Sequence, residues 1–236
     1  MKFSRGLAAL ILTIFFQVTL SAQTSAEYLY KDEVIHNPQF RADVNKLGAE
    51  LYEKTGISLR LVMIKELKEG QHISEYEKDL MKNFNEPTIL LTFSELDSKV
   101  DILASDVSLY KYFNKKQVLS PVASPVQSFI MALFYSDSIE SFIETIGDYG
   151  GTIIPLLAEK AKPGELLGKY SGSMFNGYGD IADQIAESKN VVLENGLGNA
   201  NKNAVFVVKL LFYGVVFYGI FAYTRRVLYR RKHKDE

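Results

Sequence analysis

The spacing of apolar residues changes along the chain, and each spacing predicts a different element. Between residues 38 and 56 the apolar positions recur every three or four residues, which is the period of one helix face. These positions are Phe40, Val44, Leu47 and Leu51. Asn37 is a favourable N-cap, Pro38 suits a first turn and Gly56 is typical of a helix end, so the segment predicts a helix.

The next segments predict a strand, a second helix and a β-hairpin. Residues 57–64 place an apolar side chain at every second position, as a strand does. Residues 74–84 return to helical spacing and open with Ser74 and Glu77, the spacing of a capping box. An apolar run at residues 88–93 and an alternating run at 99–105 predict the hairpin. This order predicts an α/β fold with a small mixed sheet of at least three strands, covered by helices.

Short helices and a flexible segment follow. Residues 125–135, 139–149 and 152–161 have helical spacing, and we expect their apolar side chains in the core. Residues 163–203 are rich in Gly, Ser and Asn, which predicts a partly ordered stalk with one short helix. The α/β domain is therefore expected at residues 27–162.

Residues 204–223 predict one C-terminal transmembrane helix. Lys209 is the single charged residue in this stretch, and about 20 apolar residues suffice to cross a bilayer. The alkyl stem of Lys209 can stay in lipid while its ammonium group reaches the interface. The basic tail at 224–236 is expected in the cytoplasm, where its positive charges meet anionic headgroups. Its membrane-contacting residues are Arg225, Arg226, Arg230 and Arg231. The alternative is a central helix buried in protein.

The first 22 residues have the layout of a secretory signal. Lys2 and Arg5 precede an apolar run at residues 6–20, and small residues follow, with cleavage expected after Ala22 or Ala26. The alternative is an uncleaved anchor. Because basic residues mark the cytoplasmic side at both ends, we expect the domain outside the inner membrane, facing a bacterial periplasm.

Charge and cysteine usage narrow the classes of function. The whole chain has a formal charge of −1, but residues 27–203 contain 18 Lys and Arg against 26 Asp and Glu, a net charge of −8. An acidic domain argues against binding of nucleic acid, which needs a basic face. The chain has no cysteine, so disulfides and thiol catalysis are excluded.

The order of elements resembles the TPM-domain family of exported, often membrane-anchored proteins. Four stretches carry the resemblance: "YLYKDEVIHNPQF", "LYEKTGISLRLVMI", "ISEYEKDLMKNF" and "PTILLTFSELDSKVDI". The family includes thylakoid-lumen proteins implicated in photosystem II repair, and some members have been assigned calcium binding or acid phosphatase activity. The resemblance implies the α/β fold and a periplasmic domain that acts on membrane-protein partners.

Two departures separate this chain from the family pattern. The family usually has Asp-Asn-Gly before the apolar strand, where this chain has Asn85, Glu86 and Pro87. A Gly-Tyr-Gly-Leu-Glu turn usually follows the next strand, where this chain has "SDVSL" at residues 105–109. The glycines that a metal site of the family type would use are therefore missing.

Two sets of residues are candidates for a site. Four aspartates could gather Ca²⁺ or Mg²⁺, which prefer several carboxylate oxygens; the alternative is that each one serves a turn or a solvated strand face. They are Asp32, Asp97, Asp101 and Asp106. A basic aromatic stretch could contact an acidic partner or lipid headgroups; the alternative is a connector with its aromatics packed inward. It comprises Tyr110, Lys111, Tyr112, Phe113, Lys115 and Lys116.

The favoured function is a membrane-anchored periplasmic binding or assembly module without catalysis. It rests on the predicted anchor and on the lack of a convincing catalytic set in the sequence. The first alternative is a metal-dependent, acid-phosphatase-like hydrolase that uses the four aspartates. The second is a scaffold that forms a homo-oligomer through its span.

Overall fold

The computed structural model describes residues 27–232, and it places side chains for residues 27–198 and 210–229. The signal sequence predicted at residues 1–22 lies outside this range. The strands are β1 (Leu29–Asp32), β2 (Ser58–Ile64), β3 (Thr88–Ser94) and β4 (Lys99–Ala104). The helices are α2 (Pro38–Thr55), α3 (Ile73–Met81), η1 (Val107–Tyr112), α4 (Lys115–Val118), α5 (Pro125–Tyr135), α6 (Ile139–Gly147), α7 (Ile154–Ala158), α8 (Leu166–Ser188) and α9 (Asn199–Lys232).

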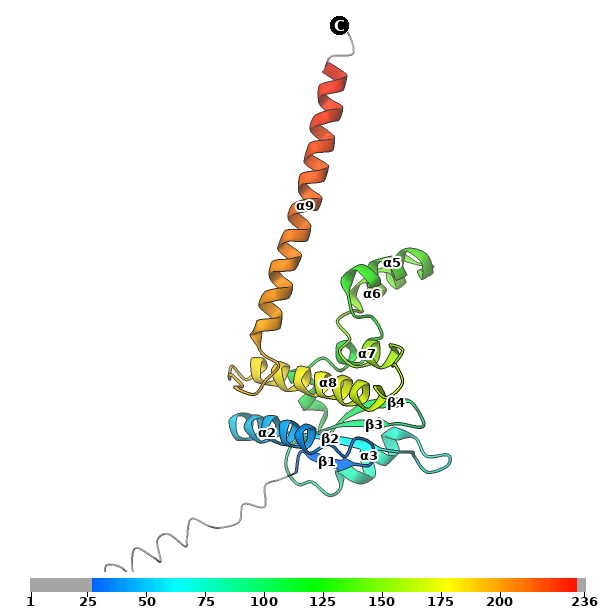
Figure 1. The fold of residues 1–236 in the computed structure, drawn as a ribbon, viewed down its shortest axis with the longest axis vertical. Coiled ribbons are helices and arrows are strands. Elements are labelled where there is room, and N and C mark those ends of the chain that lie inside the picture. The colour runs from blue at the N-terminus through cyan, green and yellow to red at the C-terminus, as the bar shows by residue number, and fades with distance from the viewer. Residues whose placement is uncertain (1–26, 233–236) are drawn as a thin grey trace, which may run out of the picture.

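The strands form one mixed sheet in the order β1-β2-β3-β4 (Figure 1). β1, β2 and β3 run parallel, joined by the crossover helices α2 and α3, and β4 returns antiparallel to β3 as the predicted hairpin. The α/β class, the mixed sheet and the order of helix, strand, helix and hairpin are thus confirmed. β1 was not predicted, because four residues are too few to show a period.

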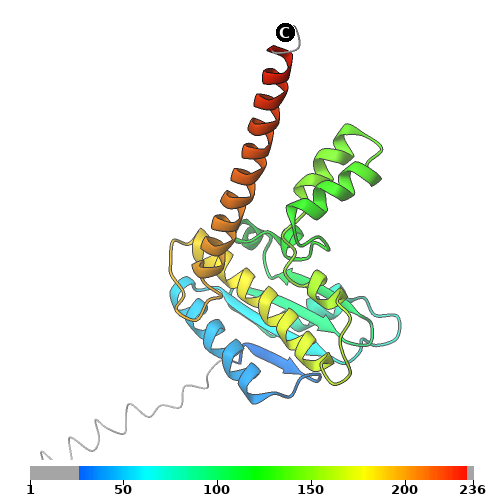
Figure 2. The ribbon, with the colours of Figure 1, turned by 45° about the horizontal axis from the view of Figure 1, so that its top comes forward.

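Helices cover both faces of the sheet, and this explains the burial of its central strands. α2 and α8 lie side by side on one face, and α3 lies on the other (Figure 2). Every residue of β2 and of β3 is buried, as is usual for parallel strands with a helix layer on each side. The alternation at residues 57–64 therefore does not mean that one face of this strand is exposed to solvent.

The first helix forms as predicted. Asn37 Oδ1 accepts hydrogen bonds from the N–H groups of Gln39 and Phe40, at 2.8 and 3.3 Å. Gly56 ends the helix with φ of 71°, the left-handed conformation that glycine adopts without strain. These caps define the two ends of α2. Its predicted apolar face, Phe40, Val44, Leu47 and Leu51, is buried.

The predicted start of the second helix is wrong. The N-cap of α3 is His72, whose N–H donates to Glu75 Oε2 at 3.4 Å, so Ser74 lies inside the first turn. Glu77 follows Ile73 by four positions and therefore shares its sheet-facing side. The Glu77 side chain is fully buried, which removes it from any capping role.

The stalk predicted from residue 163 is also wrong, because residues 166–188 form the single helix α8, which packs on the core between Ser173 and Ala186. One face of the helix is fully buried against α2 and the sheet. Its apolar residues are Met174, Tyr178, Ile181 and Ile185. A Cβ at Gly177 would lie 2.1 Å from Ile153 Cγ1, so this glycine permits close packing and does not indicate a linker.

The chain after α8 returns to α2, which extends the domain to about residue 198. Glu50 accepts hydrogen bonds from the N–H groups of Glu194 and Asn195, at 2.5 and 2.9 Å, and Lys54 Nζ donates to the Val192 carbonyl at 2.9 Å. Partial burial opposes ionisation of Glu50, but these hydrogen bonds and that from Lys54 prevail and lower its pKa to about 2. Residues 191–198 are thus tied to the core.

α5 and α6 form a helical hairpin that extends from the domain on the same side as α9 (Figures 1 and 2). We expected the apolar residues of these helices in the core, and this is wrong for the largest of them. Ile139 and Ile143 are 81% and 66% exposed, and Phe134 is 78% exposed. The two helices pack mainly on each other.

α9 is one continuous helix that contains the predicted span, residues 204–223. The side chains of residues 199–209, Lys209 included, and those of Arg230 and Arg231 lie outside the described part of the chain. Arg225 and Arg226 are exposed on the helix. Among the residues that the structure describes, no helix combines the length and the hydropathy needed to cross a membrane.

Candidate functional site

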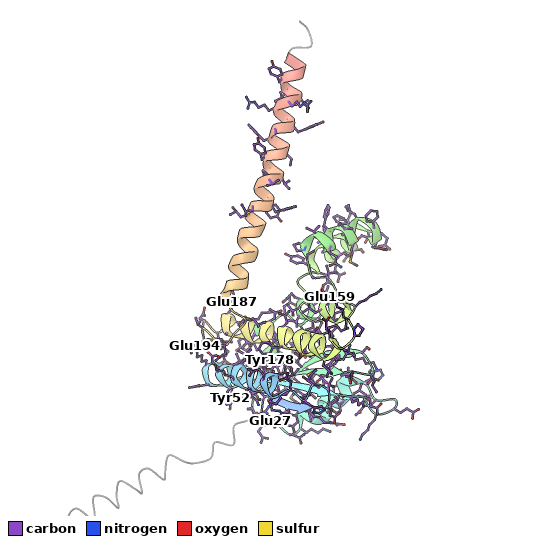
Figure 3. All side chains as sticks on the ribbon, in the orientation of Figure 1. Glu27, Tyr52, Glu159, Tyr178, Glu187 and Glu194 are labelled. Carbon is purple, nitrogen blue, oxygen red and sulfur yellow. The ribbon has the colours of Figure 1, made fainter. Side chains whose placement is uncertain are left out.

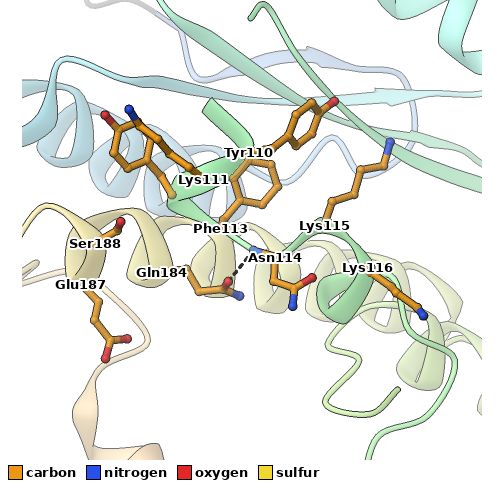
Figure 4. A pocket seen from close by; sticks show the side chains of 10 residues that line it. Tyr110, Lys111, Phe113, Asn114, Lys115, Lys116, Gln184, Glu187 and Ser188 are labelled. Atoms are coloured by element: carbon orange, nitrogen blue, oxygen red, sulfur yellow. Dashed lines mark hydrogen bonds between the residues drawn. The ribbon is translucent and has the colours of Figure 1, made fainter. Parts of the chain in front are cut away.

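A groove of about 950 Å³ lies between the η1–α4 segment and the C-terminal half of α8 (Figure 4). All six residues predicted as a contact patch line it. The complete lining is Tyr110, Lys111, Tyr112, Phe113, Asn114, Lys115, Lys116, Gln184, Glu187 and Ser188. The tertiary fold therefore places a local sequence pattern against a helix that sequence reasoning had assigned to the stalk.

Caps and side-chain amides hold the two walls of the groove. Asp106 Oδ1 accepts from Ser108 N at 2.7 Å and starts η1, and Asn114 Oδ1 accepts from Gln117 N at 3.1 Å and starts α4. Gln184 on α8 accepts from Asn114 N at 2.8 Å. Gln184 Nε2 also donates to Gln117 Oε1 at 2.7 Å. This network fixes η1 and α4 relative to α8.

Two of the aromatic residues pack inward, as the alternative interpretation held. Phe113 is buried, and its ring centroid lies 5.6 Å from that of Tyr110. The Tyr110 hydroxyl accepts a hydrogen bond from Ala104 N at 3.1 Å. These two rings therefore form the floor of the groove and anchor η1 to β4.

Tyr112 is different, because it lies between two ammonium groups. Lys111 Nζ is 4.8 Å from its ring centroid, and Lys189 Nζ is 4.4 Å from it. Lys189 and then Lys111, through hydrogen bonds and charge, lower the pKa of the Tyr112 phenol. Sequence reasoning missed Lys189, since only the packing of α8 brings it to η1.

The other two lysines of the groove already have partners. Lys115 Nζ lies 2.5 Å from Asp101 Oδ1 and also donates to the Ile102 carbonyl at 2.6 Å. Lys116 Nζ lies 3.0 Å from Glu144 Oε1, on α6. The positive charge offered to a ligand is therefore concentrated around Tyr112, with Glu187 as an acidic residue at the edge.

A buried carboxyl lies on the α3 side of the sheet. Glu77 on α3 is fully buried near Thr92 and Asp101, which face each other across β3 and β4. The Thr92 hydroxyl and the Asp101 carboxylate are close enough to the Glu77 carboxyl to act on its ionisation. Burial, together with the nearby charge of Asp101, raises the pKa of Glu77 to about 8, against the opposing effects of Thr92 and Lys115. Because no solvent reaches it, Glu77 cannot contact a substrate.

Two of the four candidate aspartates stabilise turns. Asp32 accepts hydrogen bonds from the N–H groups of Ile35 and His36, at 2.8 and 2.9 Å. Asp97 Oδ2 accepts from Leu67 N at 2.8 Å and from the hydroxyl of Ser94 at 2.5 Å, and the Ser94 contact is the larger reason that the pKa of Asp97 is lowered. Asp32 thus serves its own turn, and Asp97 joins the hairpin turn to the segment after β2.

The other two aspartates lie elsewhere. Asp101 pairs with Lys115 in the middle of β4, and Asp106 caps η1. Asp106 follows Ser105, whose N–H bonds Thr88 at the start of β3, whereas Asp32 lies at the end of β1. β1 and β3 run in the same direction, so Asp32 lies at the C-terminal ends of the parallel strands and Asp106 lies at their N-terminal ends. In residues 27–232 no group of three or more His, Cys, Asp and Glu side chains could hold a metal ion.

The sequence departure at residues 85–87 also has a structural role. Arg60, 7% exposed, donates from Nη2 to Glu86 Oε1 at 2.6 Å and from Nη1 to the Glu27 carbonyl at 3.0 Å. Its guanidinium lies 4.4 Å from the centroid of the Phe84 ring. Glu86 therefore neutralises the buried guanidinium of Arg60 on β2.

Comparison with known proteins adds no relative: no family model, no curated protein and no solved structure matches this chain.

Proposed function

We propose that this protein is a membrane-anchored, TPM-like binding module, without catalysis, whose groove between η1–α4 and α8 holds an acidic segment of a membrane-protein partner. The observation that carries the proposal is the Tyr112 ring on the groove wall, with the ammonium groups of Lys111 and Lys189 at 4.8 and 4.4 Å from its centroid. A concave, partly apolar surface with a few placed charges is the usual form of a binding site.

The chemistry of the groove selects an acidic ligand. Lys111 and Lys189 flank the Tyr112 ring, so a carboxylate from a partner would meet two ammonium groups and a phenol. An aromatic ring next to lysines gives contact area as well as charge, which is the composition of many interface centres. Binding of this kind weakens as salt rises.

Anchoring supports the same function. α9 extends away from the domain as a long helix (Figure 1), and the apolar stretch 204–223 and the basic tail fit a single span with a cytoplasmic C-terminus. With a cleaved signal, the domain would face the periplasm from the inner membrane. Tethering to the membrane raises the effective concentration of the groove for partners in the same membrane.

The hydrolase alternative lacks a supporting observation. It would need Asp32, Asp97, Asp101 and Asp106 around one ion, whereas two of them serve turns and the other two pair with Lys115 and cap η1. The binding proposal needs only the groove and the anchor.

The test measures binding of a fluorescent Asp/Glu-rich peptide to the full-length protein in a mild detergent. The double variant Lys111→Glu/Tyr112→Ala is expected to weaken binding at least about tenfold, since it reverses one charge and removes the ring. Binding by the wild type is expected to fall as salt rises. A Lys/Arg-rich peptide of the same length, which the net negative charge of the domain attracts at other places, is expected not to lose affinity in the double variant.

The matched control is Lys46→Glu/Tyr52→Ala on α2, where both residues are exposed and outside the groove. This variant makes the same change of charge and the same loss of a ring, so it is expected to bind as the wild type does. Equal loss in both double variants would indicate non-specific attraction and would refute the groove as the site. Peptide-independent self-association that blocks the groove would favour the homo-oligomer instead.

A further inference from the structure

The α5–α6 hairpin has its small residues inside and its large apolar residues outside. Ser128 and Ala132 are the buried residues of α5, and no residue of α6 is buried. The Ser128 hydroxyl donates to the Ile146 carbonyl at 2.8 Å, which draws the two helices together. Small residues at a helix contact, with a polar hydrogen bond across it, are typical of helices that pack in lipid.

The outward surface is strongly apolar. α5 has exposed apolar side chains at i, i+3, i+4, i+7 and i+8 of one helix face. The exposed large residues of the hairpin are Val126, Phe129, Ile130, Leu133, Phe134, Tyr135, Ile139 and Ile143. Exposure is highest at the tip, where Phe134, Tyr135 and Ile139 are 78%, 80% and 81% exposed. An exposed apolar surface of this extent usually marks a contact with another protein or with a membrane.

The charges and the position of the hairpin indicate which cover fits. Residues 125–147 contain no Lys or Arg, and α5 contains no charged residue at all. The hairpin extends from the same side of the domain as α9, the helix that carries the proposed span (Figures 1 and 3). Glu144 is held back toward the domain by Lys116. An apolar tip on the side where the chain would enter the bilayer fits a lipid surface.

We propose that the tip of the α5–α6 hairpin inserts into the interface of the same membrane that α9 crosses, as a second contact of the domain with lipid. This inference rests on the proposed anchor. Asp137 lies in the turn between Tyr135 and Ile139, and Glu140 follows that turn. Both keep the insertion shallow, because carboxylates are costly in hydrocarbon. Without basic residues, insertion depends on the apolar side chains and does not require anionic lipid.

Two contacts with the membrane would hold the groove in a defined orientation. Lys116 joins the groove wall to Glu144 of the hairpin at 3.0 Å. The hairpin and α9 therefore restrict how the domain can turn above the bilayer, so that the groove faces partners at a constant height.

The experiment uses the absence of natural cysteine. Single-cysteine variants Phe134→Cys and Ile139→Cys of the full-length protein carry a polarity-sensitive fluorophore and are reconstituted in phosphatidylcholine vesicles. Both probes are expected to emit at a shorter wavelength than in the same variants unfolded in denaturant without detergent. Phospholipids that carry a nitroxide near the headgroup are expected to quench both probes. Addition of anionic lipid is expected to leave the quenching unchanged or to reduce it.

Two further variants make the outcomes distinguishable. Phe217→Cys reports on α9, and Tyr52→Cys reports on an exposed site of α2, which lies on the other side of α8 from α9 (Figure 3). The hairpin probes are expected to be quenched at least about twofold more than the Tyr52 probe.

Each result then decides one question. Short-wavelength emission at Phe217 with water-like emission at Phe134 and Ile139 would overturn the hairpin inference and leave the anchor in place. Water-like emission at all three would overturn the anchor itself. Short-wavelength emission at the hairpin without quenching by lipid, growing with the ratio of protein to lipid, would show that a second copy covers the tip and would also overturn the inference.

Discussion

Replacement of Glu77 by Gln tests whether this residue of α3 is buried as a neutral carboxyl. Glutamine keeps the size of the side chain and cannot ionise. In the wild type the folded protein holds Glu77 at a pKa of about 8, against an ordinary value of 4.5. The unfolded chain therefore loses this proton far more readily than the folded protein does.

The sign and size of the effect follow from this difference. Because the folded pKa is raised, the contribution of Glu77 to stability is complete below about pH 4.5 and is lost as the pH rises toward 8. Each pH unit in that window lowers the free energy of unfolding of the wild type by about 1.4 kcal/mol relative to Glu77→Gln. Between pH 4.5 and 7 the variant is expected to gain about 3 kcal/mol on the wild type.

The assay is unfolding of the full-length protein by urea in a mild detergent at several pH values. The chain has 14 Tyr and no Trp, so tyrosine fluorescence reports the transition. The measured quantity is the difference between wild type and variant at each pH, in which the titration of the other groups largely cancels. Glu75→Gln, exposed on the same helix, is the matched control and is expected to retain the pH slope of the wild type.

A pH-independent difference between wild type and Glu77→Gln would refute the reasoning. It would mean that the carboxyl ionises in the folded protein as it does in the unfolded chain, through solvent entry or a rearranged α3.

Three further substitutions test the packing, each measured by the same urea titration at neutral pH. Tyr178→Phe removes a buried 2.8 Å hydrogen bond to a carbonyl of β2 and is expected to lower the free energy of unfolding by about 1–2 kcal/mol; no loss would argue against the docking of α8. Glu86→Gln leaves Arg60 without its carboxylate and is expected to cost about 2–4 kcal/mol; a cost below this would show that water solvates the guanidinium. Gly151→Ala places a Cβ 1.8 Å from a backbone carbonyl oxygen and is expected to cost about 3 kcal/mol or more, whereas Gly147→Ala, with open space around it, is expected to be tolerated.

The success of the sequence predictions depended on whether the signal was local. The helix from Pro38 was predicted in full because its cap, its period and its terminal glycine all lie within the segment. The short helix predicted within the stalk is the C-terminal part of α8. The rest of α8 was missed because its glycines suggest a linker, whereas Gly177 allows Ile153 to approach the helix closely. The sequence alone does not show whether a glycine makes the backbone flexible or lets a neighbouring element pack closely.

The candidate site shows the same division. The stretch from Tyr110 to Lys116 was recognised from its composition, and all six predicted residues line the groove. The opposite wall was not recognised, since Gln184 reaches it only through the fold. The contact of Lys189 with Tyr112 depends on the same packing. The four aspartates failed to converge because each is engaged by a different set of donors, such as Lys115 for Asp101 and the Leu67 N–H for Asp97, which residue type alone does not show.

The amino-acid sequence by itself determined the order of elements from α2 to β4, the acidic character of the domain and the six residues of the contact patch, because periodicity, caps and charge are local properties. The tertiary structure alone decided that α8 belongs to the core, that Glu77 is buried, that Lys189 meets Tyr112 and that the α5–α6 hairpin turns its apolar residues outward. The physical reason is that a helical or alternating pattern specifies a face, while the segment that covers this face, or leaves it open, is chosen by packing across the whole chain.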